Sequence, residues 1–195
     1  MSEKSLKYLD LLNIEQRKAV ESTEGPLLVL AGAGSGKTRV LTFRILHILF
    51  KKLATPSQIL AVTFTNKAAN EMKTRIANLI NLPVDRMWVG TFHSLSLRIL
   101  RQHFDEVGLR KNFVIIDTED QLKLVKKICE VEKIDTKEVS AKHYLNAIDS
   151  LKNKGITSEE VKENKYRKND LELRKIYRLY QSELLRLNTV DFGDL

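Results

Sequence analysis

The chain has little of the chemistry that cross-links or anchors proteins. Among its 195 residues there is a single cysteine, Cys129, which excludes an intrachain disulfide and a zinc site built from several cysteines. His47, His103 and His143 show no metal-ligand spacing and are expected at the surface or in packing. No segment approaches the roughly 18 to 20 uninterrupted apolar residues of a membrane span, and residues 1–7 lack the apolar stretch of a secretory signal. We therefore predict a cytoplasmic protein with no membrane partner.

The formal net charge is +8, and it is unevenly distributed. Residues 1–105 contain 15 Lys and Arg against 8 Asp and Glu, whereas residues 106–195 contain 18 against 17. A basic surface attracts polyanions, so the first half is a candidate for contact with nucleic acid. A generally basic, soluble surface would give the same count, and charge alone leaves both interpretations open.

The first half of the sequence alternates apolar runs with helical patterns. Buried strands are predicted over residues 26–31, 58–64 and 87–90. Helices are predicted over residues 13–21, 37–52, 65–79 and 91–104. This alternation is typical of the α/β class, in which helices flank a parallel sheet. Ligands bind at the carboxyl ends of such strands, so the loops that follow the three strands are expected at one edge of the sheet.

The second half changes character after one short apolar run. Residues 113–116 are a further candidate strand, and Asp117 or Thr118 is expected to cap a helix that continues to Val131. From there to Leu187 we find only amphipathic helical patterns, over residues 140–152, 158–163 and 170–187. We therefore predict an all-helical subdomain in this half, with Cys129 buried on an apolar helical face.

Residues 31–38 read Ala-Gly-Ala-Gly-Ser-Gly-Lys-Thr and lie between a predicted strand and a predicted helix. This context predicts a phosphate-binding loop, because glycines allow backbone N–H groups to turn toward a polyphosphate at the positive end of a helix. Lys37 would reach the β- and γ-phosphates, and the Thr38 hydroxyl would hold Mg²⁺. The strict pattern begins with glycine, whereas Ala31 takes that position here. The other loop residues expected around the nucleotide are Gly32, Ala33, Gly34, Ser35 and Gly36.

Taken in order, several segments resemble the start of a superfamily 1 DNA helicase of the UvrD/Rep/PcrA type. Residues 12–20 resemble the family's Q motif, and residues 31–38 resemble its motif I, which often begins with alanine in this family. Residues 62–72 resemble motif Ia, and residues 89–101 resemble the next DNA-contacting motif. Residues 190–195 resemble the segment where the chain re-enters the ATPase domain after a helical insertion.

The resemblance implies a domain arrangement and an activity. Residues 1–115 would form an incomplete first RecA-like motor domain, residues 116–188 an inserted helical subdomain, and residues 189–195 the return toward the motor domain. The chain would be the N-terminal part of an ATP-dependent 3′–5′ DNA helicase. Its cofactors would be ATP and Mg²⁺, and its partners single-stranded DNA and junctions of single and double strands.

The resemblance also assigns roles to individual residues. Gln16 would read the adenine edge, since its amide both donates and accepts, although Asn13-x-x-Gln16 is also the pattern of a helix cap. Arg39 would stack on the base or contact phosphate. Ring faces and hydrogen-bonding groups suited to single-stranded DNA come from Phe64, Thr65, Asn66, Thr91, Phe92 and His93. Core packing of the two phenylalanines, a helix cap formed by Thr65 and a structural role for His93 are the alternatives.

One element of the chemistry is missing from the sequence. Hydrolysis in this family needs an acidic pair after an apolar strand, one carboxylate for Mg²⁺ and one to activate water. Asp117 follows the candidate strand 113–116, but Thr118 comes next and Glu119 is offset. We therefore expect the chain alone to bind ATP weakly and not to unwind DNA. Two other interpretations stay open: a non-catalytic module that binds nucleotide or single-stranded DNA, and the front part of a helicase–nuclease.

Overall fold

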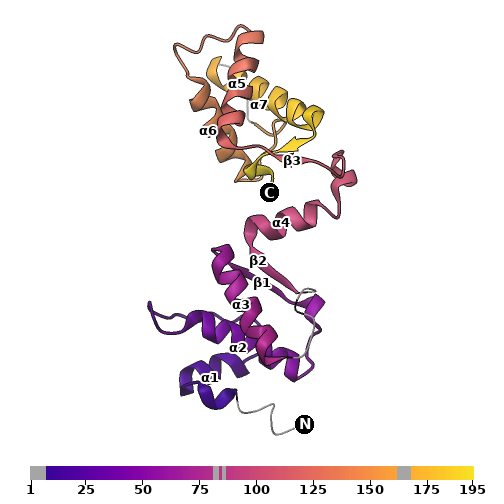
Figure 1. Cartoon of the computed structure of the whole chain (residues 1–195). Helices are drawn as coiled ribbons and strands as arrows, with labels where there is room; N and C mark the ends of the chain where they lie inside the picture. The colour runs from indigo at the N-terminus through magenta and orange to yellow at the C-terminus, as the bar shows by residue number, and fades with distance from the viewer. Residues whose placement is uncertain (1–7, 81–83, 85–86, 162–167) are drawn as a thin grey trace. The chain divides into compact units, whose positions relative to one another are not determined.

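The computed structural model describes residues 8–80, 84, 87–161 and 168–195. Residues 1–7, and residues 162–163 of one predicted helix, lie outside this part of the chain. Contacts between residues divide the chain into two compact units, residues 1–95 and 96–195, and each unit is described by itself. Figure 1 labels the α-helices of both units and the strands β1, β2 and β3.

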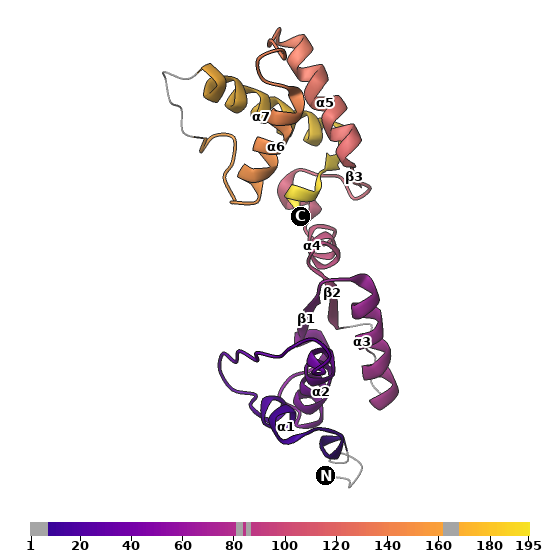
Figure 2. The same ribbon diagram turned by 90° about the vertical axis from the view of Figure 1, so that its left-hand side faces the viewer.

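The first unit combines a short parallel sheet with helices. β1 (Leu60–Thr63) pairs with β2 (Trp88–Thr91), and the register runs from Leu60–Trp88 to Thr63–Thr91. α3 (Asn66–Leu79) packs against both strands, which Figure 2 shows from the side. α2 (Lys37–Phe50) packs against α3 and against α1 (Ile14–Glu21). α4 (Phe92–Leu100) begins directly after β2.

An apolar core and local caps explain why these helices form. Leu46 of α2 and Met72 and Ile76 of α3 are fully buried, so each helix removes one apolar face from water. Thr65 Oγ1 accepts a hydrogen bond from the N–H of Ala68 at 3.1 Å, which caps α3. The predicted helices and the two predicted strands 58–64 and 87–90 are thus confirmed, although β2 is shifted by one residue and α4 ends at Leu100, four residues before the predicted end.

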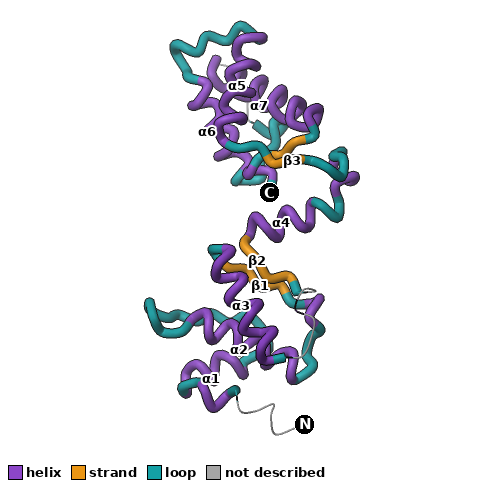
Figure 3. Tube along the Cα trace, in the orientation of Figure 1, coloured by secondary structure: helices purple, strands orange, loops and turns teal. Residues whose placement is uncertain are grey.

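The predicted strand over residues 26–31 is wrong for this structure. The segment is an irregular loop, drawn in teal between α1 and α2 in Figure 3, and Leu28 and Leu30 are 81% and 86% exposed. An apolar run becomes a strand only where a neighbouring strand supplies backbone hydrogen bonds. In the described part of the first unit, β1 and β2 pair with each other and not with this segment. The RecA-like sheet stays a prediction, and the described part of the first unit contains one parallel pair of strands.

The second unit is mostly helical. α5 (Thr118–Val131), α6 (Ala141–Lys152) and α7 (Lys168–Leu187) pack against one another around Tyr144, Ile148, Ile176, Tyr180 and Leu184. Cys129 lies in the same core with 1% of its surface exposed, as predicted. Asp117 Oδ1 accepts the N–H of Asp120 at 2.9 Å, so the predicted start of α5 is confirmed and this carboxylate serves as a helix cap.

Two details of the second unit differ from the sequence prediction. β3 (Val114–Ile115) is paired in parallel with β4 (Thr189–Val190), a strand that was not predicted. Residues 158–161 form a turn instead of the predicted helix. The N–H and the hydroxyl of Thr157 both donate to Glu160 Oε2 at 2.9 Å, and this side-chain contact stabilises the turn.

A buried ion cluster joins α6 to the residues after β4. Lys152 Nζ lies 2.8 Å from Asp191 Oδ2 and 2.7 Å from Asp194 Oδ1, and the lysine side chain is 4% exposed. The Tyr180 hydroxyl donates to Asp191 Oδ2 at 2.8 Å. Burial, together with the negative charge of Asp191, raises the pKa of Asp149. The cluster, defined by Lys152, Tyr180, Asp191 and Asp194, fastens residues 190–195 to the helices.

None of the helices in the described ranges is both long enough and apolar enough to cross a membrane.

Candidate nucleotide and nucleic-acid sites

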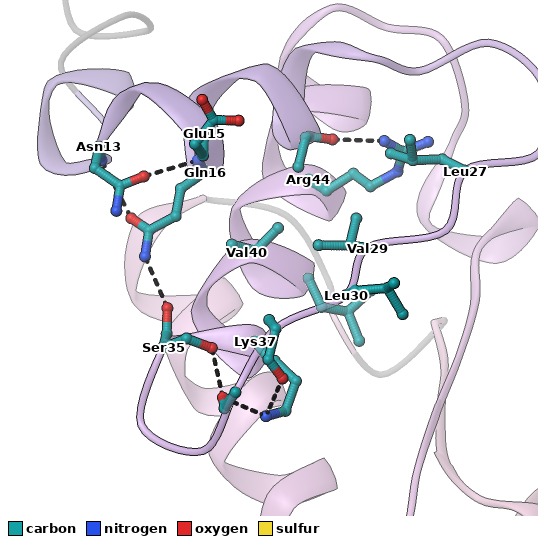
Figure 4. Close-up of a pocket in the computed structure, with 14 residues that line it drawn as sticks. Asn13, Glu15, Gln16, Leu27, Val29, Leu30, Ser35, Lys37, Val40 and Arg44 are labelled. Atoms are coloured by element: carbon teal, nitrogen blue, oxygen red, sulfur yellow. Dashed lines mark hydrogen bonds between the residues drawn. The ribbon is translucent and has the colours of Figure 1, made fainter.

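The phosphate loop, residues 31–38, leads directly into α2 (Figure 4). Gly34 and Gly36 have φ values of 74° and 86°, in the left-handed region that residues with a Cβ rarely adopt. A Cβ added to Gly36 would also lie 3.0 Å from Nε2 of Gln16. The turn from the loop into the helix therefore requires glycine at these positions.

Lys37 is the first residue of α2, and its ammonium group folds back onto the loop. Nζ donates to the carbonyl oxygens of Ala31 at 3.0 Å and of Gly32 at 2.7 Å. Ser35 Oγ donates to the same Gly32 carbonyl at 2.7 Å. These contacts keep the cation beside the loop, where it can meet an anion.

The start of α2 carries further donors. The first N–H groups of a helix have no partner within the helix and carry partial positive charge. Gly36 provides no side-chain cap for them, and Thr38 is exposed. Backbone N–H groups, an ammonium group and a hydroxyl together fit a polyphosphate that carries Mg²⁺. The contacts of Lys37 with phosphates and of Thr38 with Mg²⁺ stay predictions.

Gln16 links α1 to the phosphate loop. Its Nε2 donates to the carbonyl oxygen of Ser35 at 3.0 Å, and its Oε1 accepts the N–H of Asn13 at 3.2 Å. Asn13 Oδ1 accepts the N–H of Gln16 at 2.8 Å, which completes a capping box. The helix cap is confirmed, while the contact of Gln16 with adenine stays a prediction.

Arg39 has protein partners in this structure. Its Nη2 donates to the carbonyl oxygen of Leu11 at 2.7 Å, and its guanidinium carbon lies 5.6 Å from the centre of the Phe43 ring. The contact of Arg39 with a base or a phosphate stays a prediction.

A cavity of about 580 Å³ opens beside the loop, within the size range of small-ligand sites. Figure 4 shows its polar lining, which includes Asn13, Glu15, Gln16, Ser35, Lys37 and Arg44. Apolar side chains complete the lining, namely Leu27, Val29, Leu30, Val40 and Leu41. The cavity therefore combines polar and apolar side chains from α1, the phosphate loop, the segment before it and α2.

Arg44 was not identified from the sequence. It lies seven residues after Lys37, about two helical turns, and so shares a face of α2 with it. Its Nη1 donates to the carbonyl oxygen of Ala19 at 2.7 Å, which ties α2 to α1. Helical spacing from Lys37 is the signal that could have found it.

The two candidate DNA-contacting segments do come together. Because Thr63 is in register with Thr91, residues 64–66 and 91–93 leave the sheet at the same carboxyl edge. Phe64 is 99% exposed and Phe92 is 73% exposed, so the alternative of core packing is wrong for both. Asn66 and His93 are exposed at the same edge.

The polar residues of this edge also start the helices that follow it. Thr65 caps α3, and the N–H of Ser94 donates to Thr91 Oγ1 at 3.2 Å. Ser94 Oγ accepts the N–H of Thr91 at 2.9 Å. A Cβ on Gly90 would lie 2.5 Å from Ser94 Oγ, so this tight exit from β2 needs glycine.

The phosphate loop is not aligned with this edge through strand pairing. We predicted that it would follow a third strand of the same sheet, but residues 26–31 are outside the paired strands. What positions the loop here is α2, together with the contact of Gln16 with Ser35.

Comparisons with known proteins agree with the motif order. Residues 12–195 match the family model described as UvrD/REP helicase N-terminal domain. The chain is 45% identical over 184 residues to the ATP-dependent DNA helicase PcrA of Staphylococcus epidermidis, and 43% identical over 187 residues to that of Staphylococcus aureus. These alignments cover 94% and 96% of this chain but 25% and 26% of the relatives, so the chain spans about a quarter of their length. The chain belongs to the UvrD/REP helicase family and corresponds to the family's N-terminal domain.

Proposed function

We propose that this chain forms the part of a helicase motor that binds ATP and Mg²⁺. The observation that carries the proposal is the glycine turn into α2, where Lys37, Ser35 and Gln16 all make hydrogen bonds to one loop. The relatives named ATP-dependent DNA helicase PcrA support it at the level of the family.

The proposed binding reaction exchanges partners at Lys37. Its Nζ would leave the neutral carbonyl oxygens of Ala31 and Gly32 for the β- and γ-phosphate oxygens, which carry full charge. The backbone N–H groups of residues 32–38 would turn toward the same phosphates, and the Thr38 hydroxyl would hold Mg²⁺. Bound Mg²⁺ supplies charge neutralisation between the β- and γ-phosphates.

The base would lie against the apolar lining of the cavity. Gln16 stands beside the loop with an amide that can pair with both a donor and an acceptor of adenine. Arg39, in the first turn of α2, would stack on the base or contact phosphate. Both residues would give up one present hydrogen bond, to Ser35 and Leu11 respectively.

Single-stranded DNA would lie along the carboxyl edge of β1 and β2. Exposed Phe64 and Phe92 offer ring faces for stacking of bases, and Thr65, Asn66, Thr91 and His93 offer polar groups for phosphates or base edges. Stacking on the bases of single-stranded DNA would remove these exposed aromatic rings from water.

In the longer proteins of this family, we propose, the site takes part in 3′–5′ movement along single-stranded DNA and in unwinding at junctions. Residues 1–115 would be the first motor domain, residues 116–188 its helical insertion, and residues 189–195 the return to the motor domain. Cycles of ATP binding and hydrolysis would then shift DNA along the edge of the sheet.

The test is nucleotide binding and turnover by the 195-residue chain. Isothermal titration calorimetry with ATP and Mg²⁺ is expected to detect binding by the wild type. Binding should weaken at least tenfold in Lys37→Ala, because a charged hydrogen bond contributes about 1.5–3 kcal/mol. Lys18→Ala, an exposed lysine on α1 outside the cavity lining, is the matched control and should bind like the wild type.

Turnover separates the remaining interpretations. We expect no ATP hydrolysis stimulated by single-stranded DNA, since no acidic pair follows an apolar strand in the sequence. Turnover that Lys37→Ala abolishes would show a catalytic carboxylate within these residues and would overturn that part of the proposal. DNA binding with no nucleotide binding would favour the non-catalytic module.

A further inference from the structure

One face of α2 holds the N-terminal segment of the described chain. Arg39, Phe43, His47 and Phe50 recur at intervals of four, four and three residues, which places them in one stripe along the helix. The stripe begins at the residue directly after the phosphate loop and ends at the last residue of α2. Every member contacts the segment formed by residues 8–11 or the ring of Phe43.

Tyr8 is the anchor of that segment. Its hydroxyl and His47 Nδ1 are 2.8 Å apart, and the exposed fractions of the two residues are 6% and 5%. Its ring is stacked on Phe50 with the centroids 5.2 Å apart, and lies 6.1 Å from Phe43 at a tilt of 33°. A buried hydrogen bond at the centre of an aromatic cluster fixes both the position and the rotation of the tyrosine.

The anchored segment leads to both residues proposed to contact the base. Leu9–Leu11 is a short 3-10 helix, and the Leu11 carbonyl at its end accepts the hydrogen bond from Arg39. Two residues later Asn13 caps α1 and holds Gln16, which contacts the loop at Ser35. The guanidinium group of Arg39 also lies over the Phe43 ring, and Tyr8 contacts this same ring.

Burial and nearby charges favour the neutral forms of Tyr8 and His47. Burial lowers the pKa of His47, and the positive charges of Lys51, just after α2, and of Arg44, on α2, act in the same direction. Glu21 on α1 opposes them. Burial, with a smaller effect of Glu21, raises the pKa of Tyr8. Both side chains are therefore neutral, and the Tyr8 hydroxyl and His47 Nδ1 share one hydrogen bond whose donor is set by the histidine tautomer.

We propose that Tyr8 and His47 are positioning residues for adenine recognition: their buried hydrogen bond fixes residues 8–13 and thereby sets Gln16 at the nucleotide cavity and Arg39 in the first turn of α2. This inference rests on the proposed function, because it concerns which nucleotide the same site prefers. Neither residue lines the cavity or contacts the phosphate loop in the structure.

The experiment compares two nucleotides in matched variants of the whole chain. Dissociation constants for ATP and for GTP, each with Mg²⁺, are measured by calorimetry at pH 8 for the wild type, Tyr8→Phe and Tyr177→Phe. Tyr177 is the control, because it is also buried and its hydroxyl also makes one hydrogen bond, to the Ile156 carbonyl at 3.1 Å in the other unit. We expect the preference for ATP to fall about three- to tenfold in Tyr8→Phe and to be unchanged in Tyr177→Phe.

A second variant protects the test against a folding defect. Tyr8→Phe/His47→Phe removes both polar partners and keeps aromatic rings, a change that is often close to neutral for stability. It should show the same loss of ATP preference. In the wild type, lowering the pH until His47 is protonated should also reduce the preference, whereas the double variant should show no such pH dependence.

The outcomes separate this inference from the function on which it rests. A wild type that binds neither nucleotide, or binds both equally, contradicts the proposed function. If the wild type prefers ATP and both Tyr8 variants keep the same preference, the positioning role is overturned. The hydrogen bond between Tyr8 and His47 would then serve only to stabilise the core.

Discussion

Two lysines of this chain, Lys37 and Lys152, sit in opposite surroundings. Lys37 is exposed and donates to two neutral carbonyl oxygens of its own loop, whereas the Lys152 side chain is 4% exposed and lies between two carboxylates. The partners of Lys37 carry no net charge, so an incoming anion can replace them. The partners of Lys152 are charged, and since the Asp191 side chain is fully buried and that of Asp194 is 17% exposed, a solvent ion does not readily take their place. A lysine ammonium group thus has replaceable partners in the first unit and fixed partners in the second.

The largest expected effect is on stability of the second unit. Lys152→Ala would leave the buried carboxylate of Asp191 without its counter-ion, at a cost of about 3–5 kcal/mol. Urea denaturation followed by circular dichroism measures the loss. Lys123→Ala removes an exposed pair on α5 and should leave the transition where it is. Equal losses of stability in the two variants would contradict the difference between a buried and an exposed ion pair.

The next effect falls on DNA binding and leaves the fold unchanged. Phe64→Ala should weaken binding of single-stranded DNA by about 1–3 kcal/mol, the contribution of one aromatic stacking contact. Fluorescence anisotropy with a labelled oligonucleotide measures it. Leu79→Ala removes an apolar side chain that is 46% exposed at the opposite end of α3, and should leave DNA affinity unchanged.

A smaller effect is expected from the backbone of the phosphate loop. Gly36→Ala forces a Cβ into a left-handed conformation and against Gln16, which should destabilise the first unit by about 1–2 kcal/mol. Gly32→Ala meets nothing within 4 Å at an ordinary φ and should leave thermal unfolding unchanged. A destabilised Gly32→Ala would show that space around the loop is tighter than its exposed surface indicates.

The smallest effect is a pH dependence of stability in the first unit. The pKa of His47 is lowered from its ordinary value of 6.5 in the folded chain, so the unfolded chain takes up a proton first as the pH falls. The stabilisation is complete above about pH 6.5 and is lost as the pH drops from there through the lower pKa of the folded state. Denaturation between pH 8 and pH 5 should show this slope in the wild type and a flatter one in Tyr8→Phe/His47→Phe.

Features encoded within a few residues were predictable from the sequence. The cap pairs at Asn13, Thr65 and Asp117 were confirmed because side chain and backbone meet within three residues of each other. The turn glycines of the phosphate loop and the burial of Cys129 followed from equally local patterns.

Features that depend on distant partners were not predictable. Residues 26–31 have the composition of a buried strand, but composition does not provide the neighbour that pairs with it. β4 was not predicted because two residues are too few to show the alternating pattern of a strand. It is defined only by its pairing with β3, some 75 positions earlier in the sequence. The burial of His47 depends on Tyr8, which is 39 positions away.

The parallel pairing of β3 with β4 has a consequence for the chain's modularity. Val114 is in register with Thr189 and Ile115 with Val190, so the polypeptide leaves for α5 and returns from α7 about one strand spacing, roughly 5 Å, apart. Segments whose ends lie so close can be lengthened, shortened or exchanged without moving what they are attached to. We therefore propose that a different helical bundle can replace residues 116–188 between the same two strands, provided that the contacts of Lys152 and Tyr180 with Asp191 are kept.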